Sequence, residues 1–137
     1  MLNLTGTRIT GSGLVHLRGM QQLWSLILRD APVEDAGAEH LARLESLRGL
    51  SLDHTLIGDR GVARLALMRS LEELSLEGTT VSDESVPRLC SMQWLALLSL
   101  RRTRVSFAGM QQLHAALPTW RVFPNYLPDG VPGGVWG

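Results

Sequence analysis

The sequence predicts an α/β fold made of stacked copies of one 24-residue unit. Three observations support this prediction: leucines recur at a fixed period, their spacing changes within each period, and turn-forming residues separate the two spacings. With Leu23 as position 1, positions 1, 4 and 6 are leucine in four successive copies. These leucines are Leu23, Leu26 and Leu28, then Leu47, Leu50 and Leu52, then Leu71, Leu74 and Leu76, then Leu95, Leu98 and Leu100.

Each copy predicts a short strand, a turn and a helical return. Positions 4 and 6 alternate with small or polar residues, so both leucines face the same side of a strand. Positions 16, 19 and 20 follow at helical spacing, as in Val62, Leu65 and Ala66. Between them lie residues that commonly begin helices, such as Asp59 and Ser82. A single copy could not bury its apolar face alone, so we expect the copies to stack on one core.

The pattern LxxLxLxxTxVxDxGxxxLxxL resembles the leucine-rich repeat family over residues 1–123. The position-9 threonine is similar to intracellular repeats of bacteria and some protists, and GAEHLA and GVARLA resemble GALA-type effector repeats. The resemblance implies an α/β solenoid, a curved horseshoe fragment with parallel strands on the concave face and helices on the convex face. In related families the position-9 side chain bonds to backbone groups of the turn. A threonine hydroxyl can do the same, and Ala31 interrupts this ladder.

The chain divides into a repeat domain, residues 1–123, and a Pro/Gly-rich tail, residues 124–137. Val122 falls on position 4 of a sixth copy, and Trp120 is expected to cap the core. The tail contains three prolines and four glycines, which favours a loose linker, with a docking segment as the alternative.

The first copy begins at position 3, in the middle of a strand. We therefore expect Leu2, Leu4, Ile9 and Leu14 to be poorly covered. An open strand edge needs a cap, so the sequence predicts that upstream repeats or a neighbouring subunit cover this edge.

Composition limits the functional classes. The chain has 13 basic and 13 acidic residues, and this balance argues against general affinity for nucleic acid. No apolar run approaches the roughly 18 residues of a membrane span. Cys90 is the single cysteine, which excludes an internal disulfide and favours an intracellular, cytoplasmic setting.

Residues with catalytic or metal-binding chemistry do not converge in the sequence. His16 and His40 share position 18, but without a carboxylate or thiolate nearby they are interpreted as helix-surface residues. Cys90 and His114 share position 20, where a nucleophile and base could meet, yet this position is Arg18, Ala42 and Ala66 elsewhere, so Cys90 is interpreted as a small, partly buried helix residue. We therefore expect no enzyme, no metal and no cofactor.

A partner protein is expected on the strand face, where positions 3, 5, 7 and 8 should point outward. An alternative is that the charged position-7 residues pair with one another, Arg29 with Asp53 and Glu77 with Arg101. Five strands of five residues give a floor of about 320 Å², below the roughly 800 Å² per partner of a standard interface. The predicted partner-binding residues are Arg29, Asp53, His54, Glu73, Glu77, Arg101 and Arg102.

The sequence thus favours a non-enzymatic protein–protein interaction module. The GALA-type resemblance suggests a second hypothesis, the substrate-recognition part of a ubiquitin-ligase component or a bacterial effector. A third hypothesis is an RNA-associated assembly factor, suggested by the arginines near the C-terminal end, Arg101, Arg102, Arg104 and Arg121.

Overall fold

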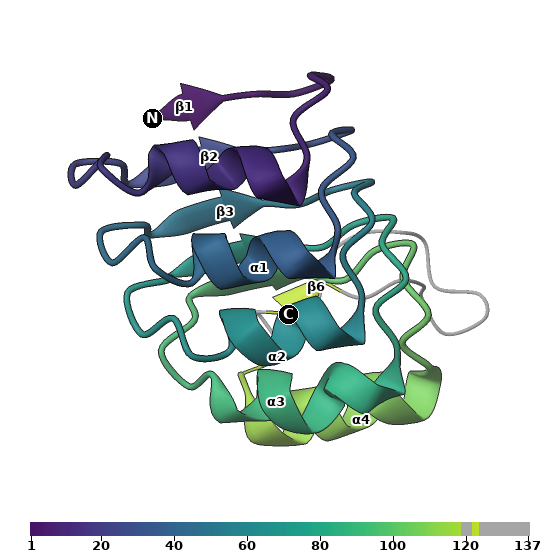
Figure 1. Ribbon diagram of the computed structural model, residues 1–137. Coiled ribbons are helices and arrows are strands. Elements are labelled where there is room, and N and C mark those ends of the chain that lie inside the picture. Colours follow the sequence, from purple (N-terminus) through teal and green to yellow (C-terminus); the bar gives the residue numbers. More distant parts are fainter. Residues whose placement is uncertain (119–121, 124–137) are drawn as a thin grey trace.

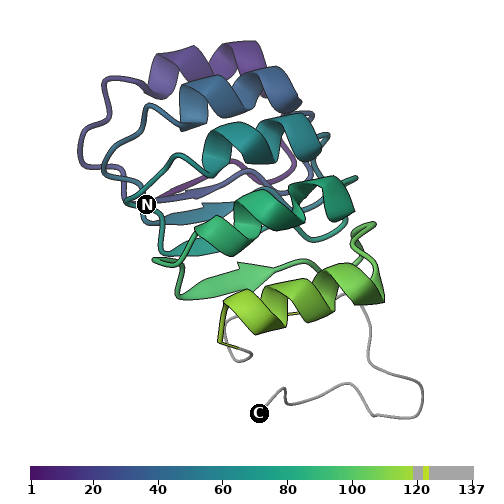
Figure 2. The ribbon, with the colours of Figure 1, turned by 90° about the horizontal axis from the view of Figure 1, so that it is seen from below.

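The computed structural model describes residues 1–118 and 122–123, which form an α/β arrangement of two layers. Within these residues, six parallel strands form one sheet in chain order. The helical segments lie in a second layer along one face of that sheet (Figure 1, Figure 2). The strands are β1 (Leu2–Asn3), β2 (Ser25–Ile27), β3 (Gly49–Ser51), β4 (Glu73–Ser75), β5 (Leu97–Ser99) and β6 (Val122–Phe123).

The helical returns differ in kind from copy to copy. The first and part of the fourth are 3-10 helices, whereas the others are α-helical. Pro87 lies in the first turn of its helix, where a missing N–H breaks no helical hydrogen bond. The returns are η1 (Gly11–Leu17), α1 (Asp35–Leu41), α2 (Asp59–Leu65), η2 (Asp83–Ser85), α3 (Val86–Ser91) and α4 (Phe107–Ala116). No helix in the described part of the chain is long and apolar enough to cross a bilayer.

The 24-residue period sets the register of the sheet. Leu26 lies opposite Leu2 on one side and Leu50 on the other, so equal positions of successive copies meet. Val122 of β6 lies opposite Leu98 of β5, which confirms the predicted start of a sixth copy. The predicted tail, residues 124–137, and Trp120 lie outside the described residues.

The repeated leucines form one continuous core between the two layers. Leu74 in β4 and Leu76 in the loop after it are 0% exposed. Leu65 of α2, in the helical layer, is also 0% exposed and belongs to the same core. Because the copies stack in register, every copy contributes the same positions to this core. The strand and helix periodicities read from the sequence therefore predicted the buried faces correctly.

The first copy is better covered than the sequence predicted. Leu14 is only 1% exposed, so the expectation that it is poorly covered is wrong. The reason is the close approach of η1 to α1: a Cβ at Gly11 would lie 2.7 Å from the amide nitrogen of Gly37. Leu2, Leu4 and Ile9 are half-buried, which agrees in part with the predicted open edge.

Candidate functional site

Threonine hydroxyls hold the turn that follows each strand. Thr55 Oγ1 donates to the carbonyl of Leu52 at 2.7 Å, and the threonines of three other copies make the same bond. This confirms the bonding expected of position 9. Ala31 has no hydroxyl, yet its amide still donates to the carbonyl of Leu28 at 3.1 Å. The turn of the second copy is therefore maintained by the backbone alone.

The residue before each threonine position adopts a left-handed backbone, which the leucine pattern did not predict. Only glycine enters this region without a clash between Cβ and the backbone. Two copies have glycine at this position, and these glycines are the feature of the sequence that could have indicated a left-handed residue there. The position-8 φ angles are 67° at Gly6, 60° at Asp30, 55° at His54, 68° at Gly78 and 55° at Arg102.

Three position-13 aspartates connect each copy to the next, and we call Asp35, Asp59 and Asp83 the aspartate ladder. Asp35 Oδ1 accepts hydrogen bonds from the amides of Gly58 at 2.6 Å and Gly61 at 3.0 Å. Both amides belong to the start of α2, where backbone donors have no helical partner. α2 begins at Asp59, as the sequence predicted, and the carboxylate of Asp59 accepts hydrogen bonds from the following copy.

Asp59 has the densest set of bonds in the ladder. It accepts from the Ser82 amide at 2.9 Å, from the Ser82 hydroxyl at 2.6 Å and from the Ser85 hydroxyl at 2.5 Å. Partial burial acts to raise the pKa of Asp59, but the serine hydrogen bonds outweigh it and lower the pKa below its usual value. Ser85 replaces the glycine found at position 15 in the other copies, and its hydroxyl gives it a bond to this carboxylate.

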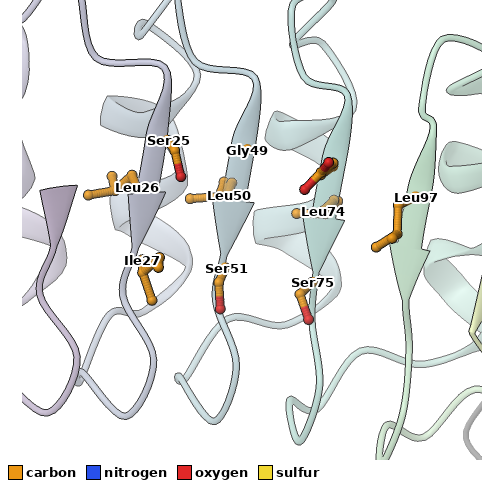
Figure 3. Close-up of a pocket in the computed structure, with 10 residues that line it drawn as sticks. Ser25, Leu26, Ile27, Gly49, Leu50, Ser51, Leu74, Ser75 and Leu97 are labelled. Atoms are coloured by element: carbon orange, nitrogen blue, oxygen red, sulfur yellow. The ribbon is translucent and has the colours of Figure 1, made fainter. Parts of the chain in front are cut away.

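We call the side chains at positions 3 and 5 of β2 to β5 the open sheet face, because no described helix covers them (Figure 1). Figure 3 shows Ile27, Ser51 and Ser75 at equivalent points of three neighbouring strands. A shallow groove of about 200 Å³ lies along this face. The open sheet face consists of Ser25, Ile27, Gly49, Ser51, Glu73, Ser75, Leu97 and Ser99.

The structure corrects the predicted role of Asp53. This residue is only 9% exposed, so the expectation that its side chain points outward is wrong. Its Oδ1 atom accepts from the Ser75 hydroxyl at 2.5 Å and from the Glu77 amide at 3.0 Å. Arg29 Nε instead lies 3.6 Å from Asp30, and not on Asp53 as the pairing hypothesis required. Asp53 therefore joins two copies in the same way as the aspartate ladder does.

The other predicted partner-binding residues are accessible to different degrees. Arg29, Glu73, Arg101 and Arg102 are exposed, whereas His54 and Glu77 are half-buried. The imidazole of His54 packs over Gly78, where an added Cβ would overlap the ring. Among the exposed residues, Arg29 follows β2, whereas the other three lie at or beside β4 and β5, so the accessible part of the predicted site extends from β2 to β5.

The histidines and the cysteine do not assemble into a reactive site among the described residues. Cys90 Sγ lies 3.8 Å from the carbonyl of Gln112, and burial raises the pKa of its thiol, which opposes thiolate formation. Burial lowers the pKa of His114, although a backbone hydrogen bond with Val122 acts in the other direction. Within the described ranges, no three histidine, cysteine or acidic side chains are placed to hold a metal ion.

No protein-family model and no curated protein matches this chain, so its function has to be inferred from the residues and geometry described above.

Proposed function

We propose that this chain is part of a leucine-rich repeat solenoid that binds a partner protein without catalysis. The regular leucine pattern, the threonine turns and the in-register parallel strands support this proposal. In that family the open sheet face corresponds to the concave face of the horseshoe. The single cysteine supports an intracellular location.

The observation that carries the proposal is the contrast between buried and outward positions of one strand. Position 4 is leucine in the first five copies and is buried throughout β2 to β5. Position 3, next to it, changes from Ser25 to Gly49, Glu73 and Leu97. A common backbone that presents different side chains on one accessible face suits recognition of a partner, because the fold itself does not require those differences.

Arg102 gives independent support. It holds a left-handed backbone with φ of 55°, a conformation that costs a non-glycine residue about 1–2 kcal/mol. Glycine occupies this position in two other copies, so the fold alone does not demand arginine. Strain of this kind is typically retained where a side chain has a function. Arg102 therefore belongs to the proposed binding surface together with its neighbour Arg101.

The size of the sheet defines how the partner must lie. The strands have only two or three residues, and even five strands of five residues would give about 320 Å², less than half of the roughly 800 Å² that a standard interface buries on each partner. The partner must therefore also contact the loops at the strand ends, including the turn that carries Arg102. Charge on this surface changes sign from Glu73 and Glu77 to the arginines one copy later, which provides orientation and specificity.

The proposal is tested by affinity capture with quantitative mass spectrometry, using the tagged chain and lysate from the source cells. The variants Glu73→Arg and Arg101→Glu should reduce capture of a specific partner by about tenfold or more. The matched controls Glu39→Arg and Arg60→Glu make the same charge changes on the exposed helical layer and should retain it. Equal capture by all four variants, or no specific partner for the wild-type chain, would contradict the proposal.

A further inference from the structure

A second surface runs along the edge where the helical returns lead back to the strands. Two grooves, of about 570 Å³ and 360 Å³, adjoin there and share Glu45 and Ser46 in their linings. The larger groove lies between the first and second copies, and the smaller groove runs from the second copy to the fourth. We call this surface the return furrow, and its main residues are Arg18, Arg43, Glu45, Ser46, Arg69 and Trp94.

The polar groups in the floor of the furrow are already bonded within the fold. The hydroxyl of Ser46 donates to the carbonyl of Leu23 at 2.9 Å, and Ser70 makes the equivalent bond to Leu47. Trp94 takes the same place in the fourth copy, where its Nε1 donates to the carbonyl of Met68 at 3.0 Å. Because these donors are used, recognition in the furrow depends on the charged residues of its rim.

The rim carries an excess of positive charge. Four arginines and two glutamates line the two grooves, which gives a local formal charge of +2 in a chain that is neutral as a whole. Arg48 is paired with Glu72 at 3.5 Å. The ion pairs found among the described residues leave Arg18, Arg43 and Arg69 without a carboxylate partner. The furrow thus has three guanidinium groups that a negatively charged ligand could neutralise.

One of these groups is held in place before any ligand binds. The guanidinium carbon of Arg69 lies 4.9 Å from the centre of the Trp94 ring, within the range of a cation–π contact. This contact uses the charge of the guanidinium group but none of its N–H donors. A preorganised arginine loses less conformational entropy when it forms a two-pronged hydrogen bond to a carboxylate.

We infer that the return furrow binds an extended acidic segment of a partner protein. From the first to the fourth copy there are three steps of about 4.8 Å, so the furrow accommodates about four residues of extended chain. Carboxylates of this segment bind Arg18, Arg43 and Arg69. A nucleic-acid backbone is less favoured, because its binding depends on a broad net basic surface and the chain as a whole is neutral.

The test is a fluorescence-anisotropy titration of the full chain with a labelled eight-residue polyglutamate peptide at low salt. Saturable binding is expected, with a dissociation constant below about 1 mM. Arg43→Glu and Arg69→Glu should each weaken it about tenfold. Arg60→Glu makes the same charge change at the start of α2 and should leave the affinity within about twofold. Circular dichroism of each variant verifies that the fold is intact.

Three results would overturn the inference. These are the absence of saturable binding, an equal loss of affinity in Arg60→Glu, and tighter binding of polyuridylate than of the peptide. The furrow residues lie outside the open sheet face, so this experiment can fail while the proposed function holds, and the reverse is also possible.

Discussion

The two ends of the strands, which form two opposite sides, or edges, of the sheet, are built from the same repeat but are bonded in different ways. On the edge where strands lead into helices, each ladder carboxylate accepts two or three hydrogen bonds from the next copy. On the return edge, a serine hydroxyl donates one bond to the position-1 carbonyl of its own copy, and the Trp94 indole donates one bond to a carbonyl of the preceding copy. Bonds to a charged group are about twice as strong as neutral ones. The first edge is therefore the more rigid, and the return edge retains grooves and unpaired arginines.

Leu74→Ala is the largest expected perturbation, because it removes core that both edges share. Leu74 is 0% exposed, and truncation should lower the free energy of unfolding by about 2–5 kcal/mol. Urea denaturation measures this change. Leu67 is 65% exposed, so Leu67→Ala is a matched control that should alter the free energy by less than about 0.5 kcal/mol.

Asp59→Asn separates the ladder from the core. The variant weakens three charge-assisted bonds, and the free energy of unfolding should fall by about 1.5–3 kcal/mol in urea denaturation. Glu39→Gln removes a charge from an exposed position of α1 and serves as the control. A loss from Asp59→Asn no larger than that of the control would refute the importance of the ladder.

Acid should weaken the ladder edge selectively. Because the folded pKa of Asp59 is lowered, its contribution to stability is complete above the unfolded pKa of about 4 and is lost as pH falls through the folded value. Urea denaturation of the wild type and of Asp59→Asn between pH 6 and about pH 2 measures the difference. We expect the two free energies to converge as the solution becomes more acidic. A difference that stays constant would exclude Asp59 as the titrating group.

Ser70→Ala tests the weaker edge. It removes one neutral hydrogen bond, from the Ser70 hydroxyl to the Leu47 carbonyl, and should lower the free energy of unfolding by about 0.5–1.5 kcal/mol. The loss should be smaller than that of Asp59→Asn under the same conditions. The opposite order would contradict the comparison between the two edges.

Arg102→Gly has the smallest expected effect on stability, and unlike the other variants it should stabilise the fold. Glycine relieves the left-handed strain but makes the unfolded chain more flexible, so a net gain of up to about 1 kcal/mol is expected. Thermal unfolding followed by circular dichroism measures it. A clear loss of stability would show that Arg102 supports the fold, which would remove it from the proposed binding surface.

The sequence predicted the scaffold well, because each buried leucine follows from a local period. Leu26, Leu50 and Val122 occupy the strand positions that the repeat assigns to them. The position-9 threonines also bond within their own turn, over a separation of three residues. Such short-range consequences can be derived from a single copy of the repeat.

The bonds between copies could not be derived in this way. The sequence placed Asp59 at a helix start, where α2 does begin, but it did not indicate that the Asp59 carboxylate bonds to residues 23 and 26 positions further along the chain. Asp53 was expected to face a partner, yet it caps an amide of the next copy. A repeat pattern gives the face on which a side chain lies but not which neighbouring copy it reaches. The return furrow was missed for the same reason, since it forms only when four copies are stacked.

The central claim is that the open sheet face provides recognition while the buried leucines and the aspartate ladder provide stability. The most direct test is isothermal titration of the captured partner with the wild-type chain and Glu73→Arg, combined with urea denaturation of both. We predict an affinity loss of about tenfold or more with the free energy of unfolding changed by less than about 0.5 kcal/mol. Unchanged affinity, or a loss of affinity that only accompanies a loss of stability, would contradict the claim.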